Sequence, residues 1–156
     1  MLLKWVNMNL QHKNNIMNQQ LTYKYSKIDL EQFAMFEENY DAAFNEVKFQ
    51  TDIQFSFDKG NNVLCSKIII TASQVEKPVL KACLCSYFEI EPESVKNLSQ
   101  DEKIVFNPFL LVQFSSLCYG SMRGVIYTKT IGSPLNSFIL PPIYLDKVID
   151  KAFVVS

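Results

Sequence analysis

The chain has 156 residues, of which 48% are hydrophobic and 20% are charged, and its formal net charge is -1. This length fits one domain, and the apolar content excludes a disordered chain. A near-neutral chain has no broad electrostatic attraction for nucleic acid, so we expect no nucleic-acid partner.

The N-terminal segment, residues 1–20, is rich in Asn, Gln and Met and shows no hydrophobic period. We predict a flexible tail there, frayed or weakly helical, followed by one domain over residues 21–156. Met1, Met8 and Met17 could each serve as the translation start. The apolar opening is too short for a signal peptide, and no run approaches the ~18 apolar residues of a membrane span. We therefore expect a cytoplasmic protein without membrane insertion.

A period of two dominates the first half of the predicted domain. Side chains that alternate between apolar and polar are typical of a strand with one solvated face. Residues 33–44 break this pattern with scattered aromatics and acids and predict an irregular connection or a short helix. Gly60-Asn61-Asn62 predicts a hairpin turn, and Glu76-Lys77-Pro78 predicts a second turn. The pattern therefore predicts an antiparallel sheet of four strands, at residues 21–30 (with a break near Ser26), 47–58, 63–73 and 79–90.

The period changes at Asn107-Pro108, where Asn suits a helix N-cap and Pro suits the first helical position. A helix of roughly five turns with a wide apolar stripe is expected to follow. Ser116, Gly120 and Gly124 recur every four residues, so another element can approach the helix closely at these positions. They are our candidates for an oligomer interface, with simple packing of the helix on the sheet as the alternative.

No acidic residue occurs between Glu102 and Asp146. The long helix therefore lacks the charged outer face of a surface helix, and we expect it to be covered on both sides or to line an apolar groove. Residues 134–142 predict an extended, Pro-containing crossover. A short closing helix is expected after it, with one face formed by Leu145, Val148, Ile149 and Phe153.

The sequence offers no catalytic constellation, so we expect no enzyme and no cofactor. Four glycines cannot build a Gly-rich phosphate loop, and the single histidine, His12, lies in the predicted tail. No ligand set with metal-site spacing accompanies the cysteines, so we expect no metal site. We interpret the four cysteines as buried free thiols, namely Cys65, Cys83, Cys85 and Cys118.

Three motifs in the second half resemble the SecB family of protein-export chaperones. Ile104–Phe109 is similar to the family's entry into its long helix, Arg123-Gly124 to the pair near the end of that helix, and Leu140–Ile143, followed by Leu145-Asp146, to its crossover. The strand block 67–88 fits the family's central hairpin, and the resemblance covers about residues 20–153. It implies an α+β fold in which a four-stranded antiparallel sheet precedes a long helix, the crossover and a short C-terminal helix.

The resemblance also implies a homotetramer, built as a dimer of dimers, that binds unfolded clients in apolar grooves. We expect an ATP-independent holdase chaperone. The family's role in protein export, through the translocation motor ATPase, would be one use of it. The sequence ends directly after the predicted last helix, without the acidic or metal-contacting tail that engages this motor. The alternative is an interaction module dedicated to one partner, such as an antitoxin in a toxin–antitoxin–chaperone system. Our client-binding candidates are Phe109, Phe114, Tyr119, Met122 and Tyr127.

Overall fold

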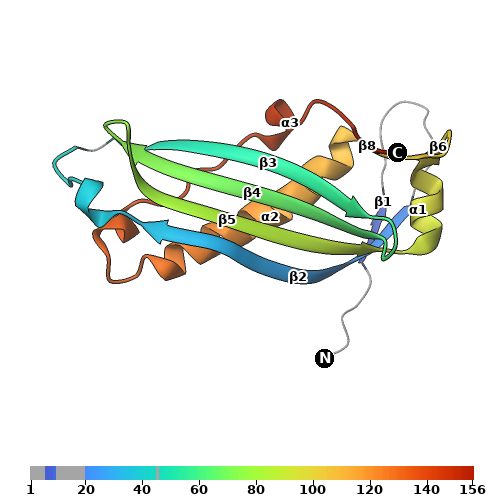
Figure 1. The fold of residues 1–156 in the computed structure, drawn as a ribbon, viewed down its shortest axis with the longest axis horizontal. Helices are drawn as coiled ribbons and strands as arrows, with labels where there is room; N and C mark the ends of the chain where they lie inside the picture. Colours follow the sequence, from blue (N-terminus) through green and yellow to red (C-terminus); the bar gives the residue numbers. More distant parts are fainter. Residues whose placement is uncertain (1–5, 10–19, 45) are drawn as a thin grey trace.

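The computed structural model describes residues 6–9, 20–44 and 46–156, and it contains a curved sheet with a long helix across one face (Figure 1). All strand pairs in this sheet are antiparallel. The α+β architecture expected from the sequence is therefore confirmed. In spatial order the strands are β1 (Val6–Asn9), β2 (Gln20–Met35), β5 (Lys77–Ile90), β4 (Val63–Gln74) and β3 (Lys48–Asp58).

β1 lies inside the segment predicted as a tail. Its four residues pair with the start of β2, from Val6 opposite Tyr23 to Asn9 opposite Gln20. Residues 6–9 are therefore a strand and not part of a frayed or weakly helical tail. The prediction missed this strand because its pairing partner lies further along the chain, and such a pairing leaves no periodic signal in the sequence. The remaining part of the predicted tail, at 1–5 and 10–19, lies outside the described residues.

β2 is longer than predicted and is irregular at two points. Its pairing with β5 shifts at Ser26 and again at Glu31, each of which is an extra residue in the strand. The shift at Ser26 coincides with the predicted break. Such bulges increase the local twist of a strand. After β2, a 3-10 helix (Glu37–Asn39) occupies part of the segment predicted as irregular or helical.

β3 and β4 follow the predicted alternation closely. Along β3 every second side chain is half-buried and the others are exposed. The β4–β5 turn lies slightly earlier than predicted, at Val75 and Glu76, whose φ angles are 48° and 61°.

The long helix α2 (Pro108–Lys129) begins as predicted. The side chain of Asn107 accepts a hydrogen bond from the Leu110 amide at 3.0 Å, and Pro108 occupies the first turn. α2 runs diagonally, from the end of the sheet near the C-terminal end of β3 to the opposite end of β2 (Figure 1). The side chains between helix and sheet form two core clusters, one around Phe88 and Phe114 and one around Ile68 and Met122.

The segments on either side of α2 were only partly predicted. Before it lie α1 (Pro92–Leu98), β6 (Ser99–Gln100) and β7 (Lys103–Phe106), none of which the sequence indicated. The crossover contains a 3-10 helix (Pro134–Ser137) before it becomes extended. The closing helix α3 spans only Leu145–Val148, and Phe153, predicted on its face, instead lies in β8 (Phe153–Val155), where it pairs with Phe106 of β7.

Candidate functional site

The predicted client-binding residues divide between the two faces of α2. Phe114 and Met122 are fully buried, and Tyr119 is 6% exposed. These three side chains belong to the two core clusters, so in this structure they present no surface to a client. Phe109 and Tyr127 lie on the outer face, 41% and 53% exposed, close to opposite ends of the helix.

Tyr119 has a structural role that its type alone did not reveal. Its hydroxyl donates a hydrogen bond to the Pro141 carbonyl at 2.6 Å, which ties α2 to the crossover. Burial raises the pKa of this phenol, so the hydroxyl remains a donor throughout the physiological range.

The predicted interface residues lie together on the outer face of α2. Ser116, Gly120 and Gly124 are all exposed. A Cβ added at either glycine would meet no atom within 4 Å, apart from the local helix backbone and the adjacent residues. Leu117 contributes an exposed apolar side chain beside them. We call the exposed strip formed by these three small residues the trough, because it carries no large side chain; Arg123 is its charged neighbour.

α2 is long and apolar enough, by length and composition alone, to cross a membrane. In this structure its buried face packs on the sheet.

A second apolar surface, which we call the aromatic row, runs between β3 and the C-terminal segment. Each of its members is half-buried and packs against one of the two core clusters. Ring pairs connect its two sides: Phe49 lies 5.6 Å from Phe138, and Phe55 lies 6.1 Å from Phe153, between centroids. The row consists of Phe49, Ile53, Phe55 and Phe57 from β3 and Phe138, Ile143 and Phe153 from the C-terminal segment.

One end of the aromatic row is fixed by polar contacts. The ring of Tyr40 lies 6.1 Å from that of Phe138, and its hydroxyl is 2.9 Å from the Ser137 hydroxyl. The buried Gln74 holds the loop that follows Tyr40, because its side chain accepts from the Asp41 amide at 2.7 Å and donates to the Phe44 carbonyl at 2.7 Å. These contacts hold the crossover close to the sheet.

The alternation at 47–58 identified the β3 half of this row as half-buried side chains, but not as a site. The other half could not be inferred, because Phe138 and Phe153 reach β3 only through the course of the crossover. No charged residue belongs to the row, so apolar burial would dominate binding there.

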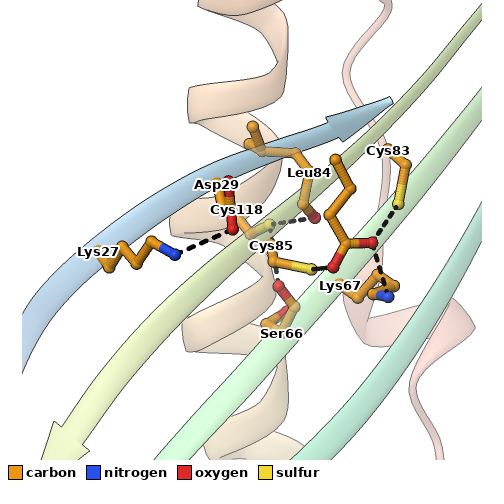
Figure 2. Close-up of polar contacts among 9 residues, drawn as sticks. Lys27, Asp29, Ser66, Lys67, Cys83, Leu84, Cys85 and Cys118 are labelled. Carbon is orange, nitrogen blue, oxygen red and sulfur yellow. Dashed lines mark hydrogen bonds and ion pairs between the residues drawn. The ribbon is translucent and has the colours of Figure 1, made fainter. Parts of the chain in front are cut away.

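On the opposite face of the sheet, Cys83, Cys85 and Lys67 gather (Figure 2), and all three contact the carboxylate of Glu31. The Cys85 thiol donates to this carboxylate at 3.1 Å, the Cys83 thiol donates to it at 3.4 Å, and Lys67 pairs with it at 2.8 Å. The bulge at Glu31 brings the carboxylate over the two cysteines of β5.

The cluster keeps its thiols protonated. Hydrogen bonds from Lys67 and Cys85 lower the pKa of Glu31, and the bond to Glu31 raises the pKa of Lys67 to about 12. Burial raises the pKa of both Cys83 and Cys85, and the nearby carboxylate raises it further. A protonated thiol is a poor nucleophile, so the cluster is not arranged for covalent catalysis.

The cysteines are free and buried, as the sequence indicated. Within the described residues, no group of three His, Cys, Asp or Glu side chains is arranged to hold a metal ion.

No family model and no curated protein matches this sequence. Among solved structures, the fold is similar to that of Rv1957, a SecB-like chaperone from Mycobacterium tuberculosis, solved in complex with a ChAD peptide from the HigA1 antitoxin. The TM-score is 0.51 at 11% identity, and the match covers 78% of this chain and 89% of the other. The chain therefore has a SecB-like fold.

Proposed function

We propose that this chain is a chaperone-like module that binds extended apolar polypeptide segments, without ATP, on the aromatic row. The observation that carries the proposal is the row itself, which is uncharged, half-buried and built from two segments distant in sequence. Aromatic side chains offer a large contact area with few conformational demands, which suits partners of varied sequence. The fold supports the proposal, because its neighbour Rv1957 is a SecB-like chaperone whose structure was solved in complex with a peptide.

The partner is either a range of unfolded clients or one dedicated polypeptide such as an antitoxin. The peptide bound by the neighbour favours a dedicated partner. Binding driven by apolar burial, worth about 25 cal/mol per Å² before ordering costs, serves both cases. We also propose that the protein is cytoplasmic, that it takes part in protein export and that it is not an enzyme.

A fluorescent apolar peptide titrated into the protein tests this function. We expect saturable binding without nucleotide, nearly equal at low and high salt, because the aromatic row carries no charge. Phe49→Thr is expected to weaken binding about tenfold, the equivalent of ~1.4 kcal/mol. The neighbouring Gln50→Thr, on the outer face of the same strand, is the matched control. No binding, or equal binding by both variants, would contradict the proposal.

We further propose that the protein is a homo-oligomer, and that the trough on α2 receives α2 of a second copy. An antiparallel pair centred near Cys118 would place Ser116 of each helix beside the partner's Gly120. Small residues at this spacing allow helices to approach closely. The exposed Leu117 and Tyr127 would be covered by such a contact.

A further inference from the structure

A short strand of the chain itself is seated on one end of the aromatic row. β8 has three residues and is an edge strand of the described three-stranded sheet, where it pairs with β7. The pairing sets Phe153 opposite Phe106 and Val155 opposite Ile104. We call residues 150–156 the C-terminal strap. A three-residue edge strand has few backbone hydrogen bonds to lose when it opens locally.

The two faces of the strap differ in their surroundings. Phe153 and Val155 are half-buried and pack against one of the two core clusters. The ring of Phe153 lies 6.0 Å from that of Phe106 and 6.1 Å from that of Phe55, between centroids. Val154, between them, is 47% exposed. The strap therefore places an aromatic and an aliphatic side chain, two positions apart, on the row.

The attachment of the strap is weak at both of its ends. The chain is anchored up to Ile149, which is buried and whose amide donates to the Leu145 carbonyl at 2.8 Å. Residues 150–152, which follow, are all exposed. At the other end, the exposed Lys59 ammonium donates to the Ser156 carbonyl at 2.5 Å. Exposed contacts of this kind contribute little to stability. The strap can therefore swing about residues 150–152 while the core stays packed.

Lifting the strap would uncover a site with two attractive features. Phe106 is fully buried, and its ring is covered by Phe153 and by Phe57, at 5.2 Å. Without the strap, rings of the row would face solvent beside the unpaired backbone groups of β7. A strand edge next to apolar pockets is a common way to bind an extended polypeptide, with the backbone providing affinity and the pockets specificity.

We propose that the C-terminal strap is an internal ligand of the aromatic row, which a bound polypeptide displaces. This inference rests on the proposed function and names the segment that the row accepts. That segment is extended and carries an aromatic residue followed two positions later by an aliphatic one, as Phe153 and Val155 do. It would pair with β7 and place its ring against Phe55 and Phe106.

Displacement also gives the row a threshold for binding. The strap and the partner exclude each other because they need the same strand edge and the same ring contacts. The apparent affinity for a partner is then reduced in proportion to the fraction of molecules whose strap is open. Weak apolar contacts would leave the strap in place, whereas a matching segment would replace it. The strap would thus cover apolar surface between binding events.

A double variant, Val105→Cys with Val154→Cys, locks the strap without changing the row. These two residues are direct partners in the pairing of β7 with β8, on the face that points away from Phe106 and Phe153. Their Cβ atoms are expected to lie about 5 Å apart, close to the spacing that a disulfide needs. Diamide takes up the two thiol hydrogens and forms the bond, dithiothreitol reverses it, and mass spectrometry verifies it. The parent chain, whose cysteines are buried, is the control for diamide.

We expect the reduced double variant to bind the fluorescent apolar peptide as the parent chain does. The oxidised form should bind it about tenfold more weakly, because the strap can no longer leave. Equal binding by the two forms would overturn this inference and leave the proposed function standing. No binding by the reduced variant and the parent chain would overturn the proposed function, and this inference with it.

A peptide copy of residues 150–156 provides a second readout. It should displace the fluorescent peptide from the parent chain. The same copy with Phe153→Ser should compete about tenfold less well, whereas the copy with Val154→Ser, changed on the outward face, should compete like the unchanged peptide. Equal competition by all three copies would contradict the proposed recognition of an aromatic residue at this position.

Discussion

Phe114→Ala is expected to lower the free energy of unfolding by about 3–5 kcal/mol, the usual range for a buried Phe. Its ring is fully buried and lies 4.6 Å from Phe88 and 5.1 Å from Tyr23, between centroids. Removing it leaves a cavity between helix and sheet that these rings cannot fill. Urea denaturation should show the loss as a lower midpoint with an unchanged slope.

Phe109→Ala is the matched control for this prediction, because it removes the same ring from the exposed side of the same helix. We expect it to lower the free energy of unfolding by less than about 1 kcal/mol. Equal losses for the two variants would contradict the assignment of Phe114 to the core and Phe109 to the surface.

Gly120→Leu is expected to disrupt assembly while leaving the fold intact. The new side chain has room in the isolated chain, since no atom lies within 4 Å of its Cβ beyond the local backbone. Leu is also a better helix former than Gly, by up to about 1 kcal/mol. In the proposed oligomer, however, the same side chain would hold the two α2 helices apart. Sedimentation velocity should therefore detect smaller species without a fall in melting temperature.

Lys129→Leu places the same side chain on the opposite side of the helix from Gly120, at an exposed position, and it should leave the oligomer unchanged. If Gly120→Leu sediments like the parent chain, the trough is not a subunit interface. A parent chain that sediments as an 18.0 kDa monomer would remove the oligomer altogether.

The fold was predictable where local patterns decide it. The alternation along β3 and the Asn107-Pro108 pair report directly on neighbouring residues, and both elements form as expected. Phe153 shows the limit of this reasoning. Its spacing from Ile149 suits a helix, but the strand pairing with Phe106 prevails, and that contact depends on the whole chain.

The candidate site was harder to predict for a related reason. α2 has apolar or small residues on both faces, so periodicity could not distinguish the face on the sheet from the face in solvent. Phe114 and Phe109 are equivalent by residue type, yet one is fully buried and the other is 41% exposed. The aromatic row required the course of the crossover, which places Phe138 beside Phe49.

The central claim is that polypeptide binds on the aromatic row. An apolar peptide that carries a benzophenone group, cross-linked by light and mapped by mass spectrometry, tests it most directly. We predict cross-links to the row, on β3 and between residues 138 and 153, that disappear when unlabelled peptide is added in excess. Cross-links confined to the outer face of α2, or to the face of the sheet that carries Glu31, would contradict the account.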